Sequence, residues 1–449
     1  MYKLILAFRY LFKKRVSYFA LAAVALCVFI VVVVMTVMRG LVIDFKQKNH
    51  SFAGDCVVAG KSLVGFPYYR DFVSTLEHQD FIEAVSPVIN SYALVNPAGS
   101  DKGVGVEIMG IDPARHSRAT GFGKTLHYNK NRPENAFVPD YDPNLVGCVL
   151  GVNLAIEPDA KGRYYHTAET IRTSLAVSCF PLTARGALAR AGTGLVNTKT
   201  FYYSDTSHSG LARIDSSMVY LPFEQAQLLC GMAGPEMRAS SLHVKFKPNI
   251  GLAAGCDKVA SLWQRFVEEK SGEKLANLLD QVSVQTWKQS RREFIAAMEK
   301  EQTMLIVMFA LVGLTTVFIV FVVFFMIVSH KSKDIGILKS IGVSNSHLVQ
   351  IFLGFAFLVG LLGSVVGLIL GWLFLSRINR IEDWLFTHFH FQLWDRTIYA
   401  IGDIPNHMDL LLLTVITASA ITACLLGALV PTRQAAKLNP VQTLQVSQL

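Results

Sequence analysis

Four long apolar runs dominate the pattern of hydrophobic and polar positions along this chain. They cover about residues 16–38, 303–328, 348–375 and 410–430, and no Asp, Glu, Lys or Arg lies inside any of them. A helix needs roughly 20 apolar residues to cross the hydrocarbon core of a bilayer, which is about 30 Å thick. Each run therefore predicts one transmembrane helix. The first run is too long for a cleaved signal peptide, and no A-x-A site follows it.

Between the first two runs, the pattern changes to the shorter periods of strands and soluble helices. Strands are predicted at 57–59, 84–95, 104–111, 217–221, 241–246 and 282–286, and helices at 69–76 and 252–269. This order predicts a mixed α/β domain over residues 41–302. We expect a βαβ-type part made of two pieces, at about 50–115 and 239–287, with an inserted β-rich part at about 116–238.

Composition agrees with a membrane protein. Of the 449 residues, 52% are hydrophobic and only 17% are charged, whereas soluble domains carry about 25% charged residues. The formal net charge of +9 could suggest a nucleic-acid partner. However, the basic residues that stand out flank the apolar runs, which favours contact with membrane lipids and no nucleic acid.

The placement of Lys and Arg predicts the orientation of the chain, because cytoplasmic loops carry an excess of these residues. Five basic residues and no acidic one precede the first run, and basic residues also prevail in the segments 329–347 and 431–449. Arginines in the segment 376–409 are balanced by acidic residues. Both termini and the middle loop are therefore predicted to be cytoplasmic. The fold class is an α-helical membrane domain with four transmembrane helices plus a large α/β extracytoplasmic domain inserted between the first and second helices.

Residues 1–15 have an amphipathic pattern ahead of the first run. Leu4, Phe8 and Leu11 fall on one face at helical spacing, and Lys3 and Arg9 fall elsewhere. Such a helix is expected to lie in the interface of the inner leaflet, with its cations near anionic lipid headgroups. The alternative is a simple extension of the first transmembrane helix.

Patterns that carry catalytic or metal chemistry are absent or weak. The sequence holds no P-loop, H-E-x-x-H or G-x-S-x-G motif. His388 and His390 lie among phenylalanines, which is more typical of an interfacial aromatic belt than of a metal site. Asp205, His208 and Ser209 suggest a hydrolase only superficially, and a polar surface loop is favoured. No catalytic, cofactor-binding or metal-binding residue is predicted.

Five cysteines lie in the predicted outer domain: Cys56, Cys148, Cys179, Cys230 and Cys256. An odd number leaves at least one of them unpaired, and no C-x-x-C motif occurs. An oxidising compartment would allow disulfides among them. Sequence spacing leaves the pairing open.

The middle cytoplasmic loop reads HKSKDIGILKSIGV at residues 330–343. Ile335, Leu338 and Ile341 would share one face of a short helix that Gly342 closes. No cytoplasmic domain of this chain is predicted to cover that face. We therefore expect a protein partner there, and contact with lipid is the alternative.

Glycines recur at every fourth position in the third run, at Gly363, Gly367 and Gly371. This spacing forms a small-xxx-small ridge, which lets two helix backbones approach closely. Tight packing within the chain or across a dimer is favoured over a stripe that faces lipid.

Two cytoplasmic motifs resemble a known family. KDIGILKSIG at 333–342 and VPTRQAAKLNPV at 430–441 are similar to segments of the FtsX/MacB/lipoprotein-releasing (LolC/LolE-type) family of mechanotransmission-type ABC transporter permeases. The single outer domain after the first run, followed by three clustered runs, also resembles that family. Residues 394–405 resemble the lipoprotein-releasing branch.

The resemblance implies a permease that is not itself an enzyme. Its partners would be a cytoplasmic ABC ATPase dimer that binds ATP and Mg, and a second permease copy or a paralogue. Movements of the ATPase would reach a periplasmic domain and release a lipoprotein or another envelope substrate from the bacterial inner membrane. Alternatives within the family are a macrolide or peptide efflux permease and a signalling permease that regulates an envelope hydrolase. The residues implied in ATPase coupling are Lys333, Asp334, Ile335, Gly336, Leu338, Lys339, Ile341 and Gly342.

Overall fold

A computed structural model describes residues 15–98, 102–159, 162–167, 170–188, 196–234, 237–330, 332–390 and 404–437. These residues form two compact units. One is a helical unit with residues up to 43 and from 297 onward, and the other is a sheet unit with residues 44–296. Apart from Arg15, the predicted interfacial helix lies outside the described residues, as do residues 394–403 and the end of the chain from residue 438.

Four long apolar helices contain the four apolar runs: α2 (Arg15–Ala53), α11 (Arg292–His330), α13 (Asn345–Leu375) and α16 (Leu410–Lys437). Each helix is long and apolar enough to cross a membrane. α2 and α11 continue past their apolar runs, so that each of them has residues in both units. The described residues thus contain four apolar helices, with a sheet-rich domain between the first and the second.

The described part of the helical unit also contains two shorter helices. α12 (Ser332–Ser340) lies between α11 and α13, and α14 (Ile378–Phe389) follows α13. Ser344 caps the start of α13, because its hydroxyl accepts a hydrogen bond from the backbone N–H of His347 at 3.4 Å. The helix α14 falls within the segment that was predicted only as an extracytoplasmic loop.

One mixed sheet of nine strands organises the described part of the sheet unit, in the order β11-β1-β10-β3-β4-β8-β5-β7-β6. Its strands are β1 (Cys56–Gly60), β3 (Ile82–Pro97), β4 (Val104–Ile111), β5 (Gly147–Gly151), β6 (Ser174–Cys179), β7 (Asn197–Ser207), β8 (Met218–Pro222), β10 (Ser241–Phe246) and β11 (Val282–Thr286). β2 (Phe66–Pro67) and β9 (Arg238–Ala239) form a separate pair. All six strands that the sequence predicted are present.

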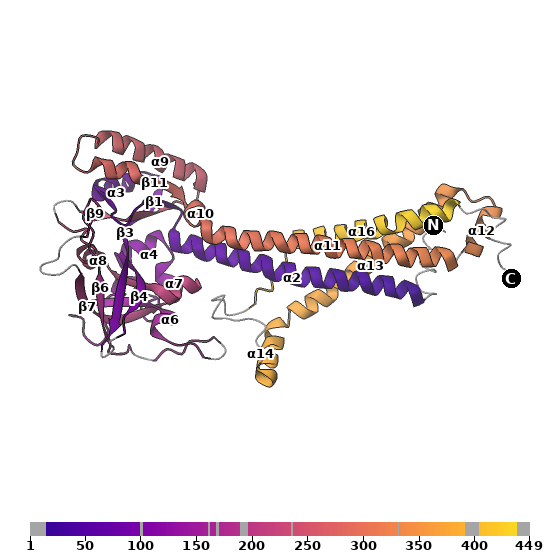
Figure 1. Cartoon of the computed structure of the whole chain (residues 1–449), viewed down its shortest axis with the longest axis horizontal. Coiled ribbons are helices and arrows are strands. Elements are labelled where there is room, and N and C mark those ends of the chain that lie inside the picture. The colour runs from indigo at the N-terminus through magenta and orange to yellow at the C-terminus, as the bar shows by residue number, and fades with distance from the viewer. Residues whose placement is uncertain are drawn as a thin grey trace. The chain divides into compact units, whose positions relative to one another are not determined.

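The first four strands of this order form two interleaved β-α-β units. β10 lies between β1 and β3 and is antiparallel to both, and the connection from β1 to β3 contains α3 (Tyr69–Glu77). In the same way, β1 lies between β10 and β11, and the connection from β10 to β11 contains α9 (Leu252–Glu269). Figure 1 shows the strands β1, β3, β4, β6 and β7 of the sheet together with the helices α3 and α9. The two predicted helices of the outer domain are therefore both crossover helices.

The strands of the predicted inserted part, β5 to β8, extend this same sheet beyond β4, which belongs to the predicted βαβ-type part. β4 is antiparallel to β3, with Val104 opposite Val95 at one end and Ile111 opposite Val88 at the other. On its other side, β4 is parallel to β8. β5 and β7 also form a parallel pair. The long β3 makes this extension possible, because it pairs with β10 at 82–88, with β4 at 88–95 and with β6 at 93–97. The boundaries at about 116 and 238 stay a prediction.

Both faces of the sheet are covered by apolar side chains. On β3, Ile89 belongs to the core cluster that also holds Phe72 of α3 and Trp263 of α9, whose ring centroids lie 4.7 Å apart. The adjacent Val88 belongs to a second cluster, which contains Tyr220. This alternation follows from the two-residue period of a strand.

Short helices fill the remaining connections of the sheet unit. These are α4 (Pro113–Ala119), α5 (Phe122–Thr125), α6 (Val152–Ala155), α7 (Ala212–Ser217), α8 (Phe223–Leu229) and α10 (Trp287–Ser290), with 3-10 turns at Pro133–Asn135 and Ala276–Gln281. The Asp112-Pro113 turn predicted after β4 is the N-cap of α4. The carboxylate of Asp112 accepts hydrogen bonds from the backbone N–H groups of Ala114 and Arg115 at 3.0 and 3.1 Å.

Candidate functional site

The glycine ridge of α13 lies against α2 of the same chain. A Cβ atom built on Gly367 would lie 2.6 Å from the carbonyl oxygen of Ala25, and one on Gly363 would lie 2.9 Å from a methyl carbon of Val24. On Gly371 the corresponding distance to Val32 is 3.1 Å. Larger side chains at these positions would push the helices apart. The ridge therefore brings α13 and α2 into backbone contact within one chain.

Two further glycines, which the sequence reasoning did not single out, join the other helices of this unit. A Cβ atom on Gly360 would lie 3.1 Å from the Cα atom of Ile421 on α16, and one on Gly427 would lie 2.6 Å from the carbonyl oxygen of Val317 on α11. Gly360 therefore contacts α16, whereas the predicted ridge on the same helix contacts α2. The four long helices are consequently linked in the series α2–α13–α16–α11 by glycine contacts.

The predicted coupling loop contains both buried and exposed apolar residues. Ile335 is only 1% exposed, whereas Ile341 is 75% exposed and Ile337 is also exposed. Ile335 and Ile341 therefore do not form one uniformly exposed face. They also do not lie on one helix, since α12 ends at Ser340 and Ile341 lies in the turn that follows. The side chains of Lys333, Asp334 and Leu338 lie outside the described set.

Two local features hold this loop in place. The ammonium group of Lys339 donates a hydrogen bond to the carbonyl oxygen of Ala436 at 2.8 Å, which satisfies one of the free carbonyls in the last turn of α16. Gly342 has φ +94°, a conformation that residues with a side chain rarely adopt. Gly336 is buried beside Ile335. The loop is therefore a defined turn attached to the end of α16.

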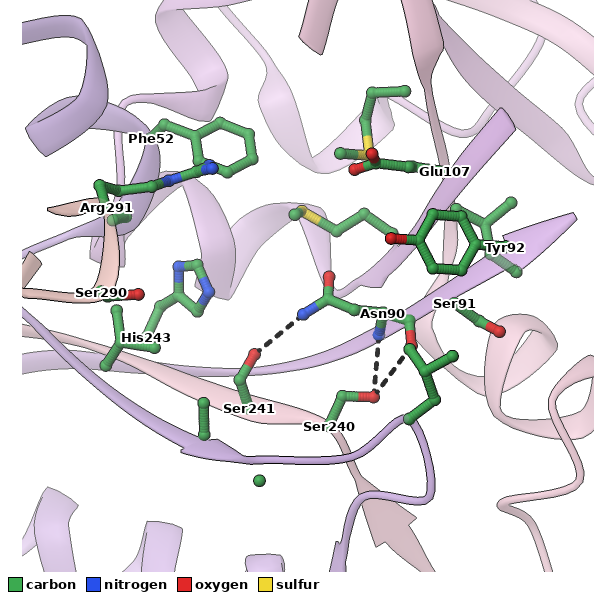
Figure 2. Close-up of a pocket in the computed structure, with 18 of the residues that line it drawn as sticks. Phe52, Asn90, Ser91, Tyr92, Glu107, Ser240, Ser241, His243, Ser290 and Arg291 are labelled. Atoms are coloured by element: carbon green, nitrogen blue, oxygen red, sulfur yellow. Dashed lines mark hydrogen bonds between the residues drawn. The ribbon is translucent and has the colours of Figure 1, made fainter. Parts of the chain in front are cut away.

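The sheet unit contains a separate cavity of about 350 Å³, with polar and apolar side chains in its wall (Figure 2). The guanidinium carbon of Arg291 lies 4.3 Å from the ring centroid of Phe52 and 5.5 Å from that of Phe294. Burial lowers the pKa of Arg291 to about 10. Arg291 makes no ion pair within the described ranges, and Glu107 of the cavity wall pairs with Arg213 instead.

A buried histidine lies beside this arginine (Figure 2). His243 is 5% exposed, and its Nδ1 atom has no hydrogen-bond partner among the described residues. Burial, followed by the charge of Arg291, lowers the pKa of His243 to about 4. The imidazole is therefore neutral at pH 7.

The floor of the cavity is a hydrogen-bonded group of polar residues. The backbone N–H of Asn90 donates to the hydroxyl of Ser240 at 2.9 Å, and the Asn90 side-chain amide donates to the hydroxyl of Ser241 at 3.2 Å. Together with Arg291 and His243, these groups can hold water or a small polar molecule through hydrogen bonds. No cluster of three or more potential metal ligands occurs in the part of the chain that the structure describes.

Within the superficial hydrolase pattern, His208 and Ser209 share a partner outside the pattern, because Nε2 of His208 lies 3.8 Å from the carboxylate of Asp215, which also binds Ser209. The buried Asp205 carboxylate accepts hydrogen bonds from the backbone N–H groups of Tyr128 and Asn129 at 3.0 and 2.8 Å. Ser209 donates its hydroxyl to Asp215 at 2.7 Å. Burial raises the pKa of both Asp205 and Asp215. Because Asp205 orders a loop and Ser209 bonds to a different aspartate, this arrangement is not a catalytic triad.

The two histidines of α14 lie next to aromatic rings. The ring of His388 lies 5.0 Å from that of Trp384, and the ring of His390 lies 6.2 Å from that of Phe386. Nδ1 of His388 also lies 3.1 Å from the carbonyl oxygen of Trp384. These contacts agree with the aromatic environment expected from the sequence.

Comparison with known proteins identifies relatives of both the helical unit and the whole chain. Residues 306–440 match the family model of the FtsX-like permease C-terminal domain. The lipoprotein-releasing system transmembrane protein LolC of Neisseria meningitidis serogroup B is 23% identical over 439 residues, which cover 97% of this chain and 95% of that protein. LolE of Haemophilus influenzae, of the same system, is 25% identical over 119 residues, or 26% of this chain and 29% of that protein.

A solved structure also aligns with about half of the chain. The crystal structure of the periplasmic region of MacB from Actinobacillus actinomycetemcomitans aligns with a TM-score of 0.30 and 12% sequence identity, and the alignment covers 54% of this chain and 94% of that one. The family match and the LolC similarity confirm the family resemblance expected from the sequence.

Proposed function

Because the chain resembles the FtsX-like permeases of ABC transporters, we propose that it is a mechanotransmission permease of a lipoprotein-releasing system. The observation that carries this proposal is the similarity to LolC along 97% of the chain, together with the family match at 306–440. The permease lies in a bacterial inner membrane, with its sheet unit in the periplasm. A separate cytoplasmic ABC ATPase dimer binds ATP and Mg, and this chain has no catalytic residue of its own.

In this proposal the ATPase contacts the turn between α12 and α13. Ile337 and Ile341 supply exposed apolar surface for the contact. The hydrogen bond from Lys339 to Ala436 connects the turn to α16, so that a displacement of α12 also acts on that helix. A small apolar contact of this kind concentrates its binding energy in a few central residues.

Tightly packed helices then carry the movement away from the ATPase. The glycine contacts of α13 with α2 and of α16 with α11 leave little space between the backbones, and closely packed elements move together rather than deform. α2 and α11 are continuous helices with residues in both units. The substrate, a lipoprotein or another envelope molecule, responds to the resulting change in the periplasmic domain.

Affinity purification of the full chain in mild detergent tests this function. We expect an ATPase with a P-loop and an acylated protein to co-purify, together with a second permease copy or a paralogue. Recovery of a periplasmic adaptor and an outer-membrane channel would instead indicate efflux, and recovery of an envelope hydrolase would indicate signalling. Purification without any ATPase would contradict the whole class.

Cysteine labelling in intact spheroplasts tests the orientation. Ser340 and Tyr165 are exposed residues of the helical and the sheet unit. A membrane-impermeant maleimide should label Tyr165→Cys from outside, whereas Ser340→Cys should react only after the membrane is opened. The unmodified chain controls for its seven native cysteines. The reverse pattern would contradict the proposed topology.

A further inference from the structure

Two pairs of cysteines meet inside the sheet unit, although the members of each pair are far apart in the sequence. The Sγ atoms of Cys56 on β1 and Cys256 on α9 lie 2.8 Å apart. The Sγ atoms of Cys179, at the end of β6, and Cys230, directly after α8, lie 3.7 Å apart. Non-bonded heavy atoms usually stay about 3.5–4.0 Å apart. The first pair is therefore closer than an ordinary contact, and the second is at contact distance.

The backbone already holds the first pair in position. Cys56 is the first residue of β1, which is the central strand of three. It lies opposite Val244 of β10 and Thr286 of β11. Cys256 lies in the second turn of α9, and the aromatic residues of that helix pack into the same core cluster as Cys56. Because both segments are fixed by their neighbours, a bond requires only a small closure of the two side chains.

The remaining cysteines lack such a sulfur neighbour. Cys148 of β5 is completely buried in the core and has no sulfur partner among the described residues. Burial raises its pKa to about 12, so it stays a neutral thiol. Cys27 and Cys424 lie in the apolar helices α2 and α16, near enough to interact electrostatically, but their sulfur atoms are not in hydrogen-bond contact. The structure thus separates the seven cysteines into two pairs and three single thiols.

We propose that Cys56–Cys256 and Cys179–Cys230 are disulfide bonds in the mature protein and that Cys148 stays reduced. This inference rests on the proposed function, because it needs the sheet unit to lie in the oxidising periplasm. Each bond forms when two thiols give up two protons and two electrons. The electrons pass to a periplasmic oxidant of the dithiol–disulfide oxidoreductase class, whose own disulfide is reduced to two thiols.

The Cys56–Cys256 bond closes a long segment of chain at a mechanically important point. The two residues are 200 positions apart, and Cys56 follows the end of α2 by three residues. A crosslink that closes a long loop restricts the unfolded chain strongly. Reduction of this bond should therefore lower the melting temperature of the sheet unit by several degrees.

Mass spectrometry of the full chain tests the pairing. The protein is isolated from cells with an oxidising periplasm, unfolded without reductant, alkylated and digested. We expect one linked peptide for Cys56 and Cys256 and one for Cys179 and Cys230, with alkylation only at the other three cysteines. After reduction, all seven cysteines should be alkylated. The absence of either linked peptide, or a linkage to Cys148, would overturn the corresponding bond.

Matched variants separate this result from a failure of the proposed topology. Cys148→Ser should keep both linked peptides, and Cys56→Ser should free Cys256 for alkylation while it keeps the Cys179–Cys230 link. Labelling of Tyr165→Cys from outside without any linked peptide would overturn the disulfides but leave the location intact. Failure to label Tyr165→Cys from outside would overturn the periplasmic location on which the disulfides depend.

Discussion

At the scale of single residues, His243 couples the stability of the sheet unit to pH. Burial lowers its pKa from 6.5 to about 4, and burial also lowers the pKa of His116, whose ring lies 5.4 Å away. The unfolded chain therefore binds protons between about pH 6.5 and 4 that the folded chain does not bind. The stabilisation that the neutral His243 contributes should therefore be complete above about pH 6.5 and should be lost as the pH falls through this range.

Thermal unfolding of the full chain at pH 7.5 and pH 4.5 measures this effect. His243→Gln removes one titrating group, so its melting temperature should fall less between the two pH values than that of the unmodified chain. The exposed His78 provides the control, because His78→Gln should keep the full pH dependence. An equal pH dependence in all three proteins would contradict the buried, neutral state of His243.

Gly367 is the glycine at which α13 and α2 approach most closely. Gly367→Ala would bring a carbon to 2.6 Å from the Ala25 carbonyl oxygen, and such overpacking typically costs about 1–3 kcal/mol. The melting temperature in detergent should therefore fall. Gly354 lies on the same helix with nothing within 4 Å of an added Cβ atom, so that Gly354→Ala should be neutral or stabilising. Equal behaviour of the two variants would rule out the close contact.

At the scale of elements, Gly342 fixes how the coupling loop turns from α12 toward α13. Its φ of +94° disfavours any side chain, and Gly342→Ala should cost about 1–2 kcal/mol of local stability. Proteolysis near residues 332–342 should then become faster. Gly313→Ala on α11 is the control, since an added Cβ atom meets nothing within 4 Å. Unchanged cleavage in Gly342→Ala would contradict a defined turn.

Elements with a regular pattern could be predicted from the sequence, and those that depend on distant partners could not. The predicted ranges 104–111, 241–246 and 252–269 coincide with β4, β10 and α9, because each has an unbroken strand or helix period. β5 has only five residues, of which the first and the last are glycines, and its parallel partner β7 begins more than forty residues later. Nothing local to Gly147–Gly151 indicates that pairing.

The same distinction applies to the candidate site. The four-residue spacing of Gly363, Gly367 and Gly371 predicts a close helix contact, but no sequence spacing indicates that α2 is the partner. Gly360 and Gly427 do not belong to a run of glycines at every fourth position, so that repeat did not indicate them. Arg291 and His243 come together in the cavity only because β1, β10 and β11 pair, and neither belongs to a recognised motif.

At the scale of the whole molecule, one account connects these features. In the proposed function, exposed apolar residues of α12 and of the turn after it would receive a movement. The glycine contacts keep the four long helices together, and α2 and α11 lead into the sheet unit. The two proposed disulfides would strengthen the sheet unit in the periplasm. The central claim is that the turn after α12 is where a separate ATPase binds.

The most direct test of this claim is the amount of ATPase recovered with a tagged permease that carries one charged substitution. Ile341 is 75% exposed in the turn, and Phe389 is 67% exposed at the end of α14, in the segment predicted to lie outside the cytoplasm. Ile341→Asp places an unpaired charge in the proposed apolar contact. At equal permease expression, it should reduce the recovered ATPase by on the order of tenfold, and Phe389→Asp should leave the recovery unchanged. Full recovery with Ile341→Asp would contradict the account.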